Sequence, residues 1–152
     1  MGNRISVYLD NCCFNRPYDD QGHLSIYLET QAKLAIQELI KDKEVFLFWS
    51  FMLDYENQAN PDEVIKNEIF LWRVIAKDIV SSSIQLVDNS KTYIQSGLGK
   101  KDALHLASAI EVKCDYFITV DKGILRKAKQ LEGIVVCNPI EFIDIWEDKN
   151  VI

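Results

Sequence analysis

The chain has 152 residues and 48% of them are hydrophobic, so it can bury one core without disulfides or a structural metal. Met1 to Ser6 lacks the apolar stretch of a signal peptide, and no apolar run approaches the roughly 20 residues that a membrane helix needs. The net charge of −6 argues against nucleic-acid binding through bulk electrostatic attraction, so any such contact must be local. We therefore expect residues 1–152 to form one soluble, cytoplasmic domain with no membrane segment.

The cysteines give no sign of a zinc site. They form no C-x-x-C pair, and no histidine lies near them at zinc-finger spacing. We interpret them as small buried hydrophobic residues in a reducing compartment. They are Cys12, Cys13, Cys114 and Cys137.

Short apolar runs alternate with longer helical patterns along the whole chain. Each run is short enough for a buried parallel strand. The predicted strands are Ile5 to Leu9, Val45 to Trp49, Ile84 to Val87, Tyr116 to Val120 and Ile134 to Cys137.

Apolar residues at spacings of three and four predict amphipathic helices between these runs. The apolar face of the first helix is Leu24, Leu28, Ala32, Ala35 and Leu39. The face of the second is Ile65, Ile69, Trp72, Ala76 and Ile79. A third helix runs from Lys101 to about Lys113, and its inward residues are Ala103, Leu106, Ala107 and Ile110. Pro61 suits the start of the second helix, and Pro139 suits the start of a last one.

Strands separated by helices imply βαβ units with right-handed crossovers. We therefore predict an α/β fold with three layers, α/β/α, and a central parallel sheet of about five strands. In such Rossmann-like sheets, ligands bind at the carboxyl ends of the strands. Functional residues are expected at that edge.

Four carboxylates lie where the predicted fold brings chain connections to this edge. Asp10 follows the first strand at once, and Asp121 follows the strand that begins at Tyr116. Glu56 lies a few residues past the strand that begins at Val45, and Asp102 opens the third helix. Any one of them alone is explained by helix capping or by exposure to water. Several together are harder to explain by stability.

A cluster of carboxylates needs a cation. Two carboxylates about 5 Å apart repel by roughly 3 kcal/mol at an effective dielectric constant of 20, so a bare cluster partly protonates. Oxygen ligands with few protein donors suit Mg²⁺ or Mn²⁺ best. The carboxylates therefore predict a site for one of these ions.

The segments VYLDNCCFNRP, SFMLDYEN, GKKDALHLASAIE and FITVDKGI resemble, in order and spacing, the acidic motifs of PIN-domain nucleases, which include the VapC-type toxins. The similarity covers nearly the whole chain. It places Asp10, Glu56, Asp102 and Asp121 at the positions of the family's metal-binding carboxylates, and Thr119 at a position that supports the last of them. The resemblance implies a PIN-like fold and a metal-dependent endoribonuclease that leaves 5′-phosphate and 3′-hydroxyl ends.

The first motif departs from the family pattern. It commonly reads Asp-Thr-Asn, whereas here Asn11, Cys12 and Cys13 follow Asp10, so the supporting role of the threonine is unfilled. The stretch from Asn15 to His23 is longer than expected between the first strand and the first helix. These departures bear on substrate choice more than on metal binding.

We hypothesise that Asp10, Asp102 and Asp121, aided by Glu56, hold one or two divalent ions against a scissile RNA phosphate. We assign Thr119 and Asn11 as supporting residues. Flanking phosphates are expected to contact Arg16, Lys100 and Lys101.

Other polar and aromatic residues near these motifs have two interpretations. His105 either orients Asp102 or is a buried, hydrogen-bonded histidine. Glu29 is a weaker site candidate, because Lys33 at i+4 suggests an exposed helix pair. The aromatic side chains of Trp49, Phe51 and Tyr55 either stack bases or pack in the core, and packing is the expectation for at least Trp49 and Phe51.

Two other functions compete with the nuclease. A metal-dependent phosphatase also places an aspartate after its first strand, but its second aspartate is missing because Cys12 stands there. A catalytically inactive PIN-like protein-binding module is the stronger alternative. The resemblance also makes an antitoxin partner and a homodimer plausible.

Overall fold

The computed structural model describes residues 4–150. The two ends of the predicted domain, residues 1–3 and 151–152, lie outside the described residues, as does the start of the Met1 to Ser6 segment. The centre of the fold is a five-stranded parallel sheet with the strand order β3-β2-β1-β4-β5. This confirms the predicted parallel sheet. The strands are β1 (Ile5–Leu9), β2 (Val45–Ser50), β3 (Asp78–Val80), β4 (Tyr116–Ile118) and β5 (Val135–Cys137).

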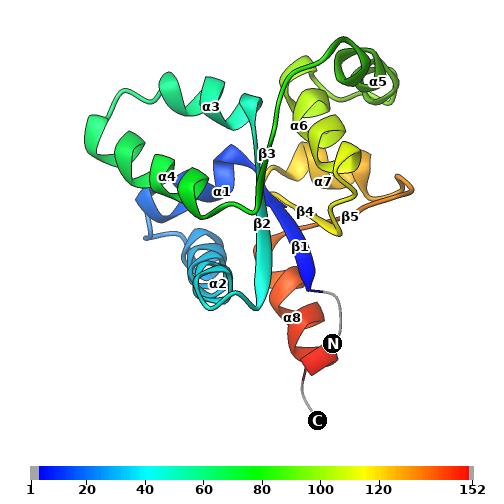
Figure 1. Cartoon of the computed structure of the whole chain (residues 1–152). Helices are drawn as coiled ribbons and strands as arrows, with labels where there is room; N and C mark the ends of the chain where they lie inside the picture. The colour runs from blue at the N-terminus through cyan, green and yellow to red at the C-terminus, as the bar shows by residue number, and fades with distance from the viewer. Residues whose placement is uncertain (1–3, 151–152) are drawn as a thin grey trace.

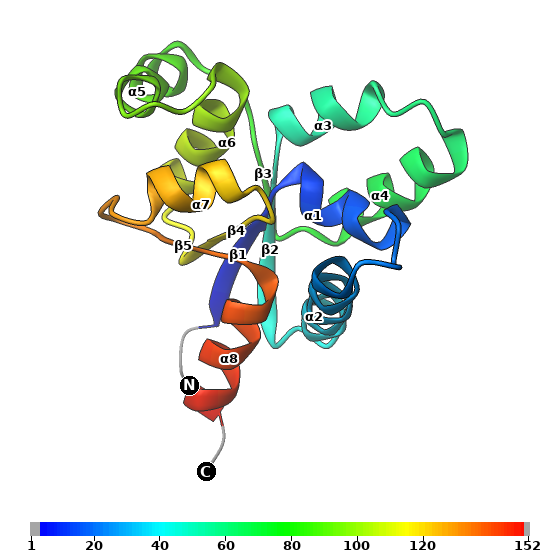
Figure 2. The same cartoon turned by 180° about the vertical axis from the view of Figure 1, so that it is seen from behind.

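Helices cover both faces of the sheet and confirm the three-layer α/β/α prediction. Figure 1 shows α2, α3 and α4 on one side of the strands and α5 and α6 on the other, and Figure 2 shows the same arrangement from behind. No helix in the described part of the chain has the length and apolar character needed to span a membrane. The helices are α1 (Asn11–Asn15), α2 (Leu24–Lys41), α3 (Phe51–Gln58), α4 (Glu63–Ile75), α5 (Ile84–Gln95), α6 (Lys100–Glu111), α7 (Lys122–Ala128) and α8 (Pro139–Asn150), with the 3-10 helix η1 (Arg16–Tyr18) after α1.

The order of the strands places a ligand-binding edge between β1 and β4. The chain runs from β1 outward to β2 and β3, then returns across the sheet to β4 and β5. Connections that run in opposite directions lie on opposite faces when crossovers are right-handed. The strand order therefore reverses at the carboxyl ends of β1 and β4, and in such sheets ligands bind at the point of reversal. Asp10 ends the β1 side, and its amide donates to the carbonyl of Ile118 at the end of β4, at 2.9 Å.

The predicted strand from Ile84 to Val87 is wrong. These residues begin α5, and the strand at this point in the sheet is β3, formed by Asp78–Val80. Ser83 caps α5, because its hydroxyl accepts from the amide of Leu86 at 3.0 Å. Ile84 is 92% exposed, so the apolar run was not a buried strand. A short apolar run cannot distinguish the two structures by periodicity.

The apolar face predicted for the first helix is also wrong. Leu24 and Leu28 are 72% and 45% exposed, and the buried side chains of α2 belong to the opposite side of the helix. That helix carries apolar residues on more than one side, so spacing alone selected the wrong stripe. The buried residues are Thr30, Lys33, Ile36, Gln37 and Ile40.

Two further helix predictions are tested by the ends of α4 and α6. The second predicted face extended to Ile79, but α4 ends at Ile75 and Ile79 belongs to β3. Asp62 caps α4, so Pro61 precedes the cap. The third helix begins at Lys100 and its inward face is confirmed, since Ala103, Leu106 and Ala107 are buried and Ile110 packs against the core. Pro139 begins α8, as predicted.

The cysteines are free, and most of them are buried as expected. Cys13, Cys114 and Cys137 are between 0% and 2% exposed. Cys12 is half-buried, and its position in the carboxylate cluster is described below.

Candidate active site

Asp10 lies at the carboxyl end of β1 and caps the short helix α1. One carboxylate oxygen, Oδ1, accepts from the amide of Asn11 at 2.8 Å. The other, Oδ2, accepts from the hydroxyl of Thr119 at 2.9 Å and from the thiol of Cys12 at 3.3 Å. The side chain is only 5% exposed. These bonds fix the orientation of a buried carboxylate at the carboxyl ends of β1 and β4.

Thr119 connects Asp10 to Asp121. Its hydroxyl donates to Asp10 and accepts from the amide of Asp121 at 3.1 Å. Asp121 caps α7 through the amide of Ile124, also at 3.1 Å, and its side chain is exposed. The Cys12 thiol lies 3.3 Å from the Thr119 hydroxyl, so the cysteine contacts both Asp10 and Thr119.

Glu56 reaches the same edge from α3 and meets His105 from α6. Nε2 of His105 is hydrogen bonded to Oε1 of Glu56 and lies 3.8 Å from Oδ1 of Asp10. An ionised carboxylate can only accept, so Nε2 carries the proton in this bond. Burial opposes a charge on His105, but the bond to Glu56 and the charges of Asp10 and Glu56 raise its pKa above the ordinary value.

The other nitrogen of His105 joins a buried chain of hydroxyls. Nδ1 is 2.5 Å from the hydroxyl of Tyr8, and that hydroxyl is 2.6 Å from the hydroxyl of Ser50. Ser50 in turn caps α3 by accepting from the amide of Met52. Tyr8, Ser50 and His105 are each at most 1% exposed. The chain therefore ties β1, the start of α3 and α6 to the carboxylate of Glu56.

Asp102 lies in the first turn of α6 and is electrostatically coupled to the other carboxylates. Burial, followed by the charges of Asp10, Asp121 and Glu56, raises the pKa of Asp102 to about 6 against the opposing effect of His105. A carboxyl group shifted in this direction gains from a nearby cation. Among the four carboxylates that the sequence singled out, Asp10 and Glu56 lie close to His105, Asp121 is linked to Asp10 through Thr119, and Asp102 interacts with the other three through its charge.

The three residues predicted to contact phosphates differ in their surroundings, because the two lysines are exposed and the arginine forms ion pairs. Lys100 and Lys101 are exposed at the start of α6, and Nζ of Lys101 lies 5.6 Å from the ring centroid of Tyr55. Arg16 is engaged by two carboxylates instead, with Nε 3.2 Å from Glu29 and Nη1 3.0 Å from Asp19. Its guanidinium is therefore partly neutralised within the protein.

The pairing of Glu29 with Arg16 overturns the predicted exposed pair with Lys33. Lys33 is 3% exposed, and its ammonium lies 5.2 Å from the ring centroid of Phe14 and 5.9 Å from that of Trp72. Glu29 and Lys33 do lie one turn apart on α2, but the side chain of Lys33 is buried in the protein interior.

Two aromatic side chains at the end of β2 and the start of α3 pack in the protein interior, as expected. Trp49 is fully buried and its indole donates to Asp54 at 2.8 Å, while Phe51 packs against the small cluster around Leu86. Tyr55 is 59% exposed. Trp49 and Phe51 are therefore packing residues.

Comparison with known proteins identifies the fold. No family model and no curated protein matches the sequence. The crystal structure of FitAcB from Neisseria gonorrhoeae matches with a TM-score of 0.56 and 16% identity, over 88% of this chain and 98% of that chain. FitB is a PIN-domain protein. The chain has a PIN-like fold.

A second solved structure supports the same conclusion. VapBC2 from Rickettsia felis, bound to a DNA fragment from their promoter, matches the PIN-like chain with a TM-score of 0.55 and 14% identity. The match again covers 88% of this chain and 98% of that chain. At these identities the likeness concerns the fold.

One group within this PIN-like site has the composition of a metal centre. Asp10, Glu56 and His105 each present one ligand atom, and these atoms lie within 4.8 Å of one another. The sequence offered His105 only as a partner of Asp102 or as a buried histidine, and the second interpretation is the observed one. Tyr8 and Cys12 were not identified as site residues. Tyr8 reaches the site through packing between β1, α3 and α6, which sequence spacing does not reveal, whereas Cys12 lies in α1 only two residues after Asp10.

Proposed function

We propose that the protein is a divalent-metal-dependent endoribonuclease of the PIN-domain toxin type, with residues 1–152 forming its single nuclease domain. The observation that carries this proposal is that Asp10, Glu56, Asp102 and Asp121 all lie toward the carboxyl edge of the sheet, where burial and the charges of the other three raise the pKa of Asp102 to about 6. Four separate segments supply these side chains. Such an arrangement opposes stability unless a cation is bound.

The residues at this edge fit a hard divalent ion. Their donors are carboxylate oxygens, one of them on a buried side chain held by hydrogen bonds, and such oxygens select Mg²⁺ or Mn²⁺. The buried amide oxygen of Asn11, beside Asp10, has no hydrogen-bond partner and is a further oxygen donor. A bound ion would lower the pKa of a water molecule and neutralise charge on the scissile phosphate.

The protein's own residues hold this site in shape. Thr119 and Cys12 orient Asp10, because both donate to its Oδ2 atom. His105 holds Glu56, and the Tyr8 hydroxyl holds His105. Partners of this kind behind metal-binding residues fix ligand geometry. We assign Asp10, Asp102, Asp121 and Glu56 as the catalytic carboxylates, with Thr119 and Asn11 in support.

We propose that RNA is held by local cations beside the site. Lys100 and Lys101 are exposed on the helix that carries Asp102, so they are suited to flanking phosphates. Arg16 is a weaker contributor because Glu29 and Asp19 already neutralise much of its charge. A few local contacts are consistent with the net charge of −6.

We further propose a small antitoxin partner and a homodimer, acting in the cytoplasm. The FitAcB and VapBC2 structures are toxin–antitoxin complexes, and VapBC2 is bound to a DNA fragment from their promoter, which supports a partner for this chain. Copurification of this chain with the product of a neighbouring reading frame would test the partner. Light scattering of the purified chain would test the dimer.

Cleavage of a mixed RNA pool tests the proposed activity. We expect cuts that require Mg²⁺ or Mn²⁺, disappear with EDTA and with Asp102→Asn, and leave 5′-phosphate ends. Asp144→Asn, which changes an exposed carboxylate on α8, is the matched control and should cut like the wild type. Failure of the wild type to cut any RNA, with normal folding, would favour the inactive protein-binding module.

A further inference from the structure

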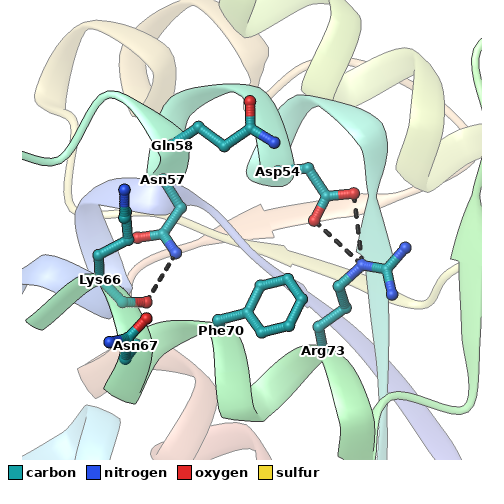
Figure 3. A pocket seen from close by; sticks show the side chains of 7 residues that line it. All are labelled: Asp54, Asn57, Gln58, Lys66, Asn67, Phe70 and Arg73. Carbon is teal, nitrogen blue, oxygen red and sulfur yellow. Dashed lines mark hydrogen bonds and ion pairs between the residues drawn. The ribbon is translucent and has the colours of Figure 1, made fainter. Parts of the chain in front are cut away.

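A cavity of about 460 Å³ lies between α3 and α4, outside the carboxylate cluster (Figure 3). Its volume falls within the roughly 300–1,000 Å³ of small-molecule sites. The ring of Phe70 on α4 forms one wall and is 46% exposed. The opposite side is formed by Asn57 and Gln58 of α3, the residues that directly follow Glu56.

The charges around the cavity are mostly balanced. Arg73 lies 3.1 Å from Asp54 through its Nε atom, and this ion pair crosses the cavity from α4 to α3 (Figure 3). Lys66 lies 3.2 Å from Glu63, a residue outside the lining. The lining itself therefore has two cations and one carboxylate. This balance suits a neutral group joined to an anion, and it disfavours a cationic group.

The amide side chains supply a polar edge. Nδ2 of Asn57 donates to the backbone carbonyl of Lys66 at 2.9 Å (Figure 3), and this bond fixes which amide atom is the oxygen. The oxygen has no hydrogen-bond partner and is buried, as is Asn57 as a whole, which is only 3% exposed. Buried acceptors without partners are rare. Because this oxygen is covered by neighbouring atoms, an incoming N–H donor would pair with it only after side chains beside it shift.

We infer that this cavity binds one base of the RNA substrate, next to the nucleotide that is cut. A nucleobase is flat, neutral and bordered by donors and acceptors, and proteins recognise such bases by aromatic stacking and by hydrogen bonds to their edges. Phe70 supplies the stacking surface. Gln58 and Asn67, which are exposed, supply donors and acceptors, and Lys66 attracts the attached phosphate.

The position of the cavity connects it to the cluster. Glu56 and Asn57 are neighbours on α3, so their Cα atoms are about 3.8 Å apart, and Glu56 faces His105 while Asn57 lines the cavity. The cavity wall is anchored to β2, because the indole of buried Trp49 donates to Asp54. An RNA strand whose phosphate lies at the carboxylates can therefore place a neighbouring base beside Phe70. This inference rests on the proposed nuclease function and adds a base-binding subsite to it.

Binding without metal tests the subsite separately from cleavage. Backbone amide NMR spectra would be recorded in EDTA while a cytidine tetraribonucleotide, an abasic oligonucleotide of the same length, or an arginine-containing heptapeptide is added. We expect the cytidine oligonucleotide to shift the signals of Asn57, Gln58 and Phe70, and the other two probes to leave them in place. Phe70→Ala should weaken binding between about fivefold and about 100-fold.

Control variants separate the subsite from folding. Leu71→Ala removes an exposed side chain, 62% exposed, from the same helix outside the cavity and should bind like the wild type. Equal affinities of Phe70→Ala and Leu71→Ala would overturn the inference. So would shifts caused by the peptide alone, which would mark a protein-binding surface, or equal shifts with the abasic oligonucleotide. Cleavage of RNA without these shifts would refute the subsite and leave the nuclease proposal standing, whereas shifts without cleavage would do the reverse.

Discussion

Nε2 of His105 is hydrogen bonded to the carboxylate of Glu56, although the two residues are 49 positions apart and lie on different helices. This bond brings α3 and α6 together at the carboxyl edge of the sheet. Glu56 therefore shares with Asp10 a buried donor that fixes its carboxylate, whereas Asp121 is exposed. The arrangement assigns His105 the role of a positioning residue for Glu56.

Tyr8→Phe is expected to loosen this positioning without changing the size of the core. The variant removes the hydroxyl between His105 and Ser50, which leaves both of them buried without that partner. We expect a loss of about 1–3 kcal/mol in the free energy of unfolding, measured by urea denaturation. We also expect weaker binding of Mn²⁺.

A matched substitution checks the reason for this effect. Tyr116→Phe removes a hydroxyl from the neighbouring strand β4 and should leave Mn²⁺ binding unchanged. Unaltered Mn²⁺ binding in Tyr8→Phe would show that the hydroxyl chain does not position Glu56.

Lys33→Met is expected to stabilise the protein at neutral pH. Burial lowers the pKa of Lys33 from 10.5 to about 8, so the charged form is disfavoured in the folded protein. The shift corresponds to about 3 kcal/mol, and lost cation–π contacts with Phe14 and Trp72 offset part of it. A net gain of about 1–2 kcal/mol in the free energy of unfolding is the expected result at pH 7.

The pH dependence of Lys33 has a definite sign. Between about pH 8 and pH 10.5 the unfolded chain holds more protons on this side chain than the folded protein, so the wild type becomes more stable as the pH rises. Lys33→Met should lack this increase when unfolding is measured across the window. An identical rise in both proteins would refute the assignment.

Lys100→Ala and Lys101→Ala are expected to weaken RNA binding through the phosphates. Each side chain is exposed near Asp102. Each substitution should therefore remove about one phosphate contact and reduce the slope of log affinity against log salt concentration by about 1. The affinity of an uncleaved RNA in EDTA, measured over a range of salt concentrations, gives this slope. Lys91→Ala on α5 is the control, and a slope that falls equally in all three variants would mean that the RNA does not lie over α6.

The segments that meet at the site could be predicted from the sequence, but the buried hydrogen-bond partners of the carboxylates could not. Asp10 and Asp121 follow strands directly, and parallel strands end at a common edge, so the meeting of their segments follows from the strand pattern. The bond between Glu56 and His105 depends on how α3 packs against α6, which no local spacing encodes. The strand prediction at Ile84 was wrong for a different reason, since a short apolar run after Ser83 suits a strand and a capped helix equally well.

The carboxylates themselves give the last prediction, which concerns Asp102. Its pKa of about 6 lies above the ordinary 3.8, so at pH 7 the ionised side chain destabilises the protein in the absence of metal. Because Asp102 is only half-buried, solvent screening reduces this effect to about 1 kcal/mol. Asp102→Asn should therefore be slightly more stable than the wild type in EDTA.

Thermal unfolding with and without Mn²⁺ is the most direct test that the cluster is a metal site. The wild type and the Asp144→Asn control should melt at a higher temperature in Mn²⁺ than in EDTA, because an ion bound to the folded state alone stabilises it. Asp102→Asn should show little or no increase. An equal increase in all three proteins, or none in the wild type, would contradict the account and leave the four carboxylates without a metal to hold.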